Sequence, residues 1–169
     1  EYGSEMRALF TVPKDKVLVG ADLSGLELRC LAHYMGDSNY TQEILTGDIH
    51  TANQKSAGLD TRDQAKTFIY AFLYGAGDIK IRSIAGGGVE EGKELKENFL
   101  NNTPALKTLR SRAGNQALKN GYLKAIDGRK IKTLSEHSSL NFLLQSAGAI
   151  IAKRAWVIFH ELATHLNYK

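Results

Sequence analysis

The feature that most constrains this chain is a helical pattern over residues 60–75, in which large polar side chains recur at every fourth position. Thr61 and Gln64 form a capping-box pair at its start, with Asp60 as a rival N-cap. Gly75 follows the last aromatic residue, where helices commonly end. Because side chains four apart lie on one helix face, the sequence predicts a single stripe, made of Arg62, Lys66, Tyr70 and Tyr74.

The chemistry of this stripe suits an extended anionic ligand with a flat end. An arginine binds phosphate through two parallel bonds and a lysine binds it as a point charge, while two phenol rings suit a sugar or base. A nucleoside triphosphate therefore fits lengthwise, and the other helix face is apolar enough to pack into a core, through Phe68, Ile69, Phe72 and Leu73. An ordinary amphipathic helix with two surface cations is the alternative, and the helix alone leaves both readings open.

The composition is that of an ordinary globular chain. Its 169 residues are 43% hydrophobic and 24% charged, which is enough for one core of domain size. The sequence shows neither a long apolar run nor a basic-then-apolar start, so we expect no membrane span and no secretory signal. The formal charge of +4 is compatible with an anionic partner without requiring one, and the single cysteine, Cys30, excludes a disulfide framework.

Most of the remaining chain is predicted to be helical. Periodicity and capping residues place helices at about 26–35, 40–45, 49–57, 79–84, 90–101, 104–120 and from 137 to the end. Two pairs of short strands are also predicted. Residues 9–12 and 17–21 flank a turn at Pro13, and residues 122–126 and 130–134 flank Asp127-Gly128, a two-residue hairpin signal.

An acidic pair surrounds the start of the helix predicted at 26–35. Asp22 ends the strand predicted at 17–21, and Glu27 lies one helical turn further on. A carboxylate at the end of a strand is a natural Mg²⁺ ligand, because Mg²⁺ sites combine one or two carboxylates with substrate phosphates. The alternative is that Asp22 and Ser24 only cap the helix.

Two further groups of polar residues have both a functional and a structural reading. Asp48 is a plausible N-cap, and His50 behind it would be either a surface histidine or a donor to phosphate at a helix N-terminus. His137, Asn141 and Gln145 share one face of the last helix. Their side chains suit the acceptors of a DNA minor groove, or they simply form a solvated face.

Taken together and in order, these segments resemble the polymerase domain of family A DNA polymerases, the bacterial polymerase I family, and most closely its phage replicative branch. Residues 22–29, Asp-Leu-Ser-Gly-Leu-Glu-Leu-Arg, match the family's motif A. The stripe followed by Gly75 matches motif B. Residues 48–51, residues 127–129 and the Asn141/Gln145 pair match further family segments, so the resemblance covers nearly the whole chain.

The resemblance implies template-directed DNA synthesis, in which a primer 3′-hydroxyl attacks the α-phosphate of a dNTP. It implies that Asp22 holds two Mg²⁺ ions, with the backbone carbonyl of Leu23 assisting, and that Asp22 and Lys66 are the catalytic residues. It implies that His50, Arg62 and Lys66 bind the triphosphate of the nucleotide and that Tyr70 contacts its sugar and base. It also implies that Tyr74 and Glu27 exclude a 2′-hydroxyl. It assigns primer–template contacts to Arg129, His137, Asn141 and Gln145.

The fold implied is α+β and mostly helical, a partial right-hand polymerase with part of the palm plus the fingers. Residues 1–35 would be the N-terminal part of the palm with motif A, residues 36–121 the fingers, and residues 122–169 a hairpin and long helix that return to the palm. The family's motif C, His-Asp-Glu, is missing and is expected beyond Lys169. A thumb and any proofreading exonuclease are expected before Glu1, so we expect the chain alone to be inactive.

The partners implied are primer–template DNA and dNTPs, with a processivity factor or helicase as possible partners of the whole protein and no membrane. A phage origin implies the cytoplasm of a bacterial host. The alternative function is a non-catalytic nucleic-acid-binding module derived from a polymerase. A downstream His-Asp-Glu in the gene would favour the enzyme, and a stop codon would favour the module.

Overall fold

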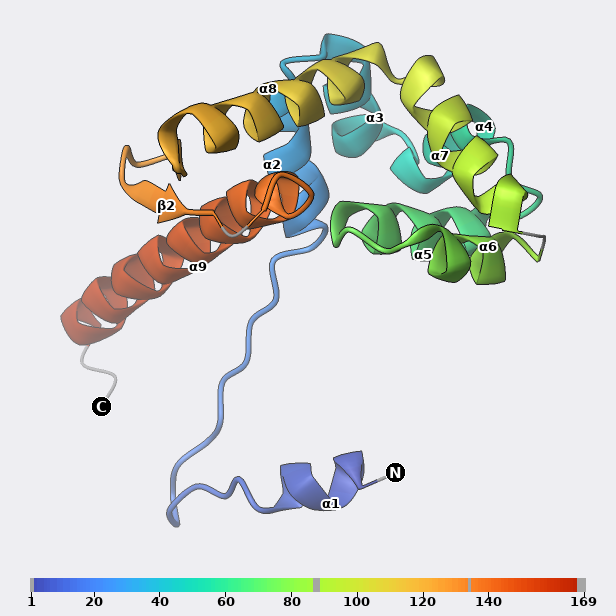
Figure 1. The fold of residues 1–169 in the computed structure, drawn as a ribbon. Helices are drawn as coiled ribbons and strands as arrows, with labels where there is room; N and C mark the ends of the chain where they lie inside the picture. The colour runs from blue at the N-terminus through green and yellow to red at the C-terminus, as the bar shows by residue number, and fades with distance from the viewer. Residues whose placement is uncertain (1, 87–88, 134, 167–169) are drawn as a thin grey trace.

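The computed structural model describes residues 2–86, 89–133 and 135–166. It is mostly helical, as the sequence predicts. The helices are α1 (Gly3–Ala8), α2 (Leu26–Met35), α3 (Ser38–Thr46), α4 (Ile49–Ala57), α5 (Arg62–Leu73), α6 (Asp78–Ala85), α7 (Val89–Asn102), α8 (Pro104–Asn120) and α9 (Ser139–His165). The strands β1 (Tyr122–Lys124) and β2 (Lys130–Lys132) form an antiparallel pair. In Figure 1, α2 lies between the α8–α9 side of the molecule and the side formed by α3 to α7.

The helix starts follow the predicted caps. The Thr61 side chain accepts a hydrogen bond from the Gln64 backbone, and the Gln64 side chain bonds back to Thr61, which confirms the capping box at α5. Asp48 caps α4 by accepting from the His50 backbone N–H. Pro104 occupies the first turn of α8, where its missing N–H costs nothing.

The centre of the core is an aromatic cluster that holds α5 against α7. Phe68 and Phe72 on α5 each meet Phe99 edge to face, with ring centroids 5.1 and 5.4 Å apart. Edge-to-face contact is a geometry that aromatic rings prefer. Each such pair stabilises the fold by about 0.5–1.5 kcal/mol beyond the contribution of the apolar area it buries. The buried face of α5 is the predicted one, extended by Ala65: Ala65, Phe68, Ile69, Phe72 and Leu73.

The hairpin between α8 and α9 forms where predicted, but its turn is longer. Leu123 pairs with Ile131, and the Ala125 N–H still donates to the Arg129 carbonyl, so the loop is residues 126–128 rather than Asp127-Gly128 alone. Gly128 has φ +87°, so it is the left-handed residue that follows the turn in a three-residue hairpin loop. The predicted strand end at Leu134 lies outside the described residues.

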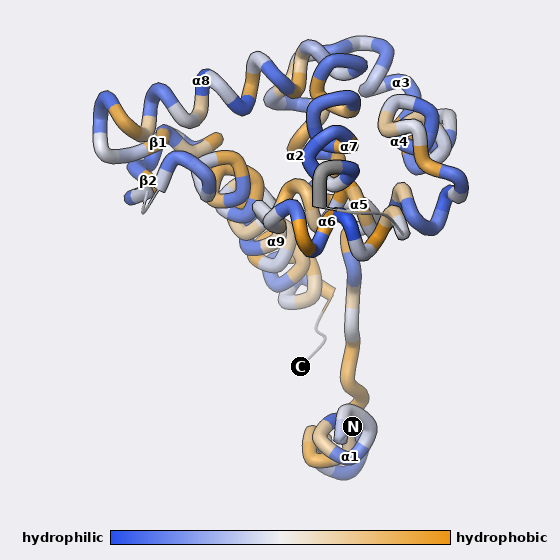
Figure 2. The backbone as a smooth tube through the Cα atoms, turned by 45° about the vertical axis from the view of Figure 1, so that its right-hand side comes forward, coloured by the Kyte–Doolittle hydropathy of each residue, from blue (hydrophilic) through white to orange (hydrophobic). Residues whose placement is uncertain are grey.

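The strands predicted at residues 9–12 and 17–21 are wrong. These residues form an exposed, extended segment that carries the short helix α1 away from the body (Figure 1). The predicted turn is present, since the Lys16 N–H donates to the Pro13 carbonyl, but no other described strand pairs with this segment. The segment contains hydrophobic residues (orange in Figure 2), and these are therefore exposed, Val17 and Leu18 among them. A strand pair without a third partner is only marginally stable in water.

The last helix, α9, is buried over its first half only. Leu140, Leu143, Leu144 and Ala147 pack into the core, whereas the second half projects away from the body (Figure 1). In this second half Trp156 stacks on Phe159. Among the described residues α9 is the one helix whose length and composition would let it cross a membrane. A single helix of this kind is weak evidence of a span, because core helices of soluble proteins pass the same test. Residues 167–169, predicted to continue it, lie outside the described residues.

A close approach between α6 and α7 gives a test of the packing. A Cβ atom at Gly92 would collide with the backbone carbonyl of Asp78 and lie 3.1 Å from the Arg82 nitrogen. We expect Gly92→Ala to lower the free energy of unfolding by about 1–3 kcal/mol, because the helix backbones must separate and this outweighs alanine's better helix propensity. Denaturant unfolding measures the change.

The matched control is Gly114→Ala in α8. The three atoms nearest to a Cβ there all belong to the exposed side chain of Glu136, which can move away. We expect this variant to be close to neutral or stabilising. Equal losses for the two variants would contradict the close approach of α6 and α7.

Candidate functional site

The predicted stripe lies on the face of α5 that the aromatic cluster leaves uncovered. Arg62 and Lys66 are exposed, Tyr70 is partly buried, and Tyr74 is the C-cap residue with 49% of its surface exposed. Since the opposite face is fixed in the core, the helix cannot rotate to bury these side chains. The structure therefore presents two cations and two phenol rings in line, as the spacing predicts.

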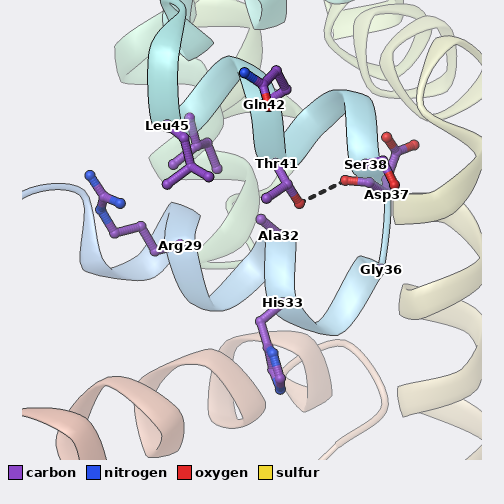
Figure 3. A pocket seen from close by; sticks show the side chains of 10 residues that line it. Arg29, Ala32, His33, Gly36, Asp37, Ser38, Thr41, Gln42 and Leu45 are labelled. Atoms are coloured by element: carbon purple, nitrogen blue, oxygen red, sulfur yellow. Dashed lines mark hydrogen bonds between the residues drawn. The ribbon is translucent and has the colours of Figure 1, made fainter.

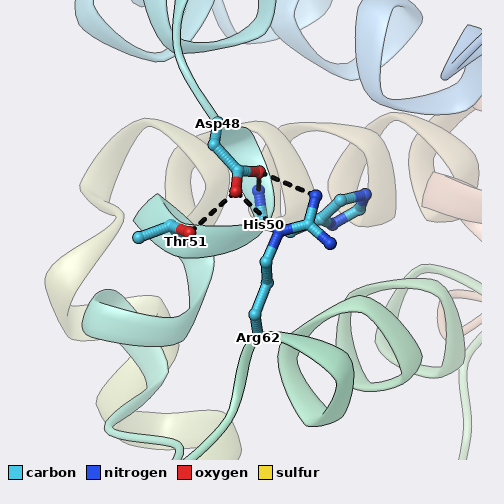
Figure 4. A network of polar contacts seen from close by, with 4 residues as sticks. All are labelled: Asp48, His50, Thr51 and Arg62. Carbon is cyan, nitrogen blue, oxygen red and sulfur yellow. Dashed lines mark hydrogen bonds and ion pairs between the residues drawn. The ribbon is translucent and has the colours of Figure 1, made fainter.

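An ion pair between α4 and α5 holds the first residue of the stripe (Figure 4). The Arg62 guanidinium donates from Nε to Asp48 Oδ2 at 2.6 Å and from Nη2 to Oδ1 at 3.1 Å. Thr51 Oγ1 also donates to Oδ2, at 2.8 Å. These hydrogen bonds, Arg62 first and Thr51 next, hold the pKa of Asp48 well below its ordinary value, so the carboxylate stays charged. Asp48 thus caps α4 and orients Arg62 at once.

His50 stands beside the middle of the stripe. Its ring centroid is 6.3 Å from that of Tyr70, and its Nδ1 is buried without a hydrogen-bond partner among the described residues. Burial lowers the pKa of the imidazole below its ordinary 6.5, and the nearby charges of Arg62 and Lys66 lower it further, against an opposing effect of Asp48. The imidazole is therefore neutral at pH 7, with one nitrogen able to accept and the other to donate.

The far end of the stripe meets α2 and α9. The Tyr74 hydroxyl donates to Glu27 Oε1 at 3.1 Å, which links residues 47 positions apart in the chain. Partial burial raises the pKa of Tyr74, the bond to Glu27 adds to this, and the Gln145 side chain acts in the opposite direction. Glu27, Tyr74 and Gln145 therefore lie together, at the end where the sequence predicts contacts with a sugar and with DNA.

The predicted metal ligands are not brought into this group. Asp22 and Leu23 are exposed in the extended segment, so the expectation that Asp22 ends a strand is wrong. The Leu23 carbonyl accepts a backbone bond from Leu26 N in the turn before α2. Among the described residues there is no cluster of three or more side chains suited to a metal. One exposed carboxylate and one carbonyl do not form a metal site by themselves.

The predicted DNA contacts fall in two places. Arg129 is at the hairpin tip, where it pairs with Asp127 at 2.6 Å. His137 is exposed just before α9, and its carbonyl lies 3.7 Å from where a Cβ of Gly75 would be, so it borders the end of α5. Asn141 is partly buried on α9 between His137 and Gln145. Only the second place adjoins the stripe.

A cavity of about 580 Å³ lies away from these residues, between α2 and α3 (Figure 3). It is lined on one side by Arg29, Ala32 and His33 and on the other by Thr41 and Leu45 among others. None of the predicted site residues lines it, so volume alone does not identify the site.

Sequence reasoning missed the second role of Asp48. The residue was identified as a helix cap, but its bond to Arg62 spans 14 positions and crosses between helices. No local pattern reports such a contact. The only available signal was the coincidence of an unpaired carboxylate cap and an arginine at the start of the next helix.

Comparison with known proteins identifies the relatives of this chain. The family model for DNA polymerase family A matches residues 1–169. The chain is 50% identical to the DNA-directed DNA polymerase of Enterobacteria phage T3 and 50% identical to that of Escherichia phage T7, over 95% of its own length in each case. It covers 26% of each relative, so the chain spans about a quarter of their length.

A solved structure supports the fold. The polymerase domain of Pol1 from M. smegmatis, in complex with DNA primer-template and dNTP, matches with a TM-score of 0.73. The match covers 86% of this chain and 29% of the other, at 22% sequence identity. At that identity the likeness supports the fold alone.

The environment of His50 gives a test by NMR titration. We expect its imidazole to titrate below 6.5, since burial and two cations disfavour the charged form. Arg62→Gln removes a cation and should raise the pKa, whereas Asp48→Asn removes the opposing carboxylate and should lower it. Shifts of the same sign in the two variants, or an unperturbed wild-type value, would contradict the arrangement in Figure 4.

Proposed function

Because this chain belongs to DNA polymerase family A, we propose that it supplies the nucleotide-binding part of an enzyme for template-directed DNA synthesis. The reaction is nucleotidyl transfer, in which a primer 3′-hydroxyl attacks the α-phosphate of a dNTP and pyrophosphate leaves. The curated relatives are DNA-directed DNA polymerases, and the chain spans about a quarter of them. The complete activity is therefore proposed for the whole polymerase and not for these residues alone.

The observation that supports the proposal is that His50 and Glu27, from two other helices, lie beside the α5 stripe, His50 near the ring of Tyr70 and Glu27 hydrogen-bonded to Tyr74. Arg62 and Lys66 form the cationic end of the stripe, neutral His50 lies beside its middle near Tyr70, and Tyr74 with Glu27 forms the other end. Contacts from α2 and α4 thus converge on the stripe. A solvated amphipathic helix, the alternative from sequence, would not need them.

We assign the roles along the stripe from its geometry and from the family resemblance. Arg62, Lys66 and His50 bind the triphosphate, and Lys66 stabilises charge on it as the leaving group departs. The ring of Tyr70 packs at the sugar and base. The Tyr74–Glu27 hydrogen bond closes the space beside the sugar, so that a 2′-hydroxyl has no room there.

Mg²⁺ is the proposed cofactor. When bound, it would neutralise charge on the phosphates. Asp22 and the Leu23 carbonyl would contribute part of its ligands. The described residues do not complete the set, so the remaining ligands would come from substrate and from groups beyond the described residues.

Primer–template DNA is the proposed second substrate. Gln145, Asn141 and His137 adjoin the end of the stripe and would contact the templating region, while Arg129 would contact DNA from the hairpin tip. The polymerase domain of Pol1 from M. smegmatis, whose fold this chain resembles, was solved in complex with DNA primer-template and dNTP.

Steady-state incorporation by a full-length polymerase that contains these residues tests the proposal. We expect Asp22→Ala to abolish incorporation through kcat, and Lys66→Ala to lower kcat/KM for dNTP by at least tenfold. Both variants should bind primer–template within about threefold of the wild type. The matched control is Lys55→Ala, an exposed lysine on α4 outside the stripe, which should change neither quantity.

Two other outcomes would contradict the proposal. If Lys66→Ala lost DNA affinity and kept its nucleotide kinetics, the stripe would be a duplex contact. If the unmodified full-length protein bound DNA and incorporated no nucleotide, the non-catalytic binding module would be the better reading.

Tyr70 gives a separate prediction about chain-terminating nucleotides. A dideoxynucleotide lacks the 3′-hydroxyl that can hydrogen-bond within the site, and the Tyr70 hydroxyl can occupy that space. A satisfied polar group there is worth about 1–3 kcal/mol. We expect the wild type to accept dideoxynucleotides and Tyr70→Phe to discriminate against them about 5- to 150-fold more. Competition between a dNTP and its dideoxy analogue measures this, and equal discrimination by the two proteins would refute it.

A further inference from the structure

The outer face of the hairpin carries a concentration of positive charge that the proposed nucleotide site does not use. Leu123 is fully buried and Ile131 partly buried, so these residues define the inner face. Because side chains alternate across a strand, the neighbouring positions point outward. The outer face, as we define it, is Tyr122, Lys124, Lys130 and Lys132.

Two of these lysines lie directly opposite each other. The register pairs Lys124 with Lys130 and Tyr122 with Lys132. Like charges at directly opposed positions destabilise a strand pair, so this arrangement weakens a hairpin of only three residues a side. Folding of the hairpin does not account for the choice of residues, whereas an anionic partner would.

No carboxylate in the part of the chain that the structure describes neutralises this face. None of the three lysines forms an ion pair with a described residue. Asp127, at the tip, is engaged by Arg129. Lys130 does contact a ring, since its Nζ lies 4.6 Å from the centroid of Tyr122. The three ammonium groups are therefore left for an external anion.

We propose that the outer face of the hairpin binds the sugar–phosphate backbone of nucleic acid. This rests on the proposed function, since it assigns that surface to a strand of the primer–template substrate. Lysines along a face with an aromatic ring between them are the pattern of nucleic-acid grooves, where cations follow the phosphates and a ring stacks on a base. An acidic protein segment would match the charge but gives no reason for the ring.

The surroundings of the hairpin favour the same partner. At the tip lies a groove of about 430 Å³ between the hairpin and α9, lined by Asp127, Arg129, Lys153 and Arg154 among others. Arg129 is paired with Asp127, so Lys153 and Arg154 are the residues that extend the positive charge beyond the hairpin. Such an extended band suits a polyanion better than a single acidic side chain.

The test is the salt dependence of DNA binding by a full-length polymerase that contains these residues. Each phosphate contact contributes about 0.7–0.9 to the slope of log K against log salt. We expect the triple variant K124Q/K130Q/K132Q to reduce that slope by about 2.1–2.7. The affinity of the wild type should then fall about 20- to 40-fold more than that of the variant between 50 and 200 mM salt. The variant should unfold at the same or a higher temperature, because a like-charge pair is removed.

The matched control has the same change of charge elsewhere. K14Q/K55Q/K80Q removes three exposed lysines from the N-terminal segment, α4 and α6, and should leave the slope unchanged. Two substrates locate the strand: a blunt duplex, and the same duplex with a single-stranded template overhang. A reduced slope on both places the face on the duplex, and a reduced slope only with the overhang places it on the single strand.

Unchanged slopes on both substrates, matching the control, would overturn the proposal and leave the face to an acidic protein partner. This outcome is distinct from failure of the proposed function. The hairpin variant could bind DNA like the wild type while dNTP incorporation continued normally. Conversely, a protein that incorporated no dNTP could still show the reduced slope.

Discussion

The packing of Phe68 and Phe72 against Phe99 is the interaction on which the rest of the structure depends. These edge-to-face contacts fix the rotation of α5 about its own axis. With one face held in the core, the other must present Arg62, Lys66, Tyr70 and Tyr74 to solvent in a fixed order. A modest rotation would bury a cation and expose a phenylalanine, and each of these changes is unfavourable. The hydrophobic effect therefore orients a site that is itself polar.

Contacts from other helices then restrain the side chains of the stripe. Asp48 restrains Arg62 through two hydrogen bonds, and Glu27 holds the Tyr74 hydroxyl. Such contacts limit the rotamers of long side chains before a ligand arrives, which reduces the entropy lost on binding. The neutral state of His50 has the same origin, since it follows from partial burial beside two cations. The geometry at this site is thus a property of α2, α4 and α5 together.

Much of the fold was predictable because its signals are local. The Thr61–Gln64 capping box and the Asp48 cap are set by neighbouring residues, and both are found in the structure. The stripe itself follows from helical spacing. The prediction of strands around Pro13 was wrong because a strand depends on a pairing partner that local sequence does not specify. This segment has no such partner among the described residues. The Asp48–Arg62 and Glu27–Tyr74 contacts were equally inaccessible, because they join helices whose relative placement only the folded structure gives.

Whether the α5 stripe binds a dNTP along its length can be seen in a structure of a full-length polymerase that contains these residues, with primer–template and an incoming dNTP. We expect the triphosphate at Arg62, Lys66 and His50, with the sugar against Tyr70 and Tyr74. A triphosphate bound away from α5, with the stripe lying on the DNA backbone, would contradict this expectation.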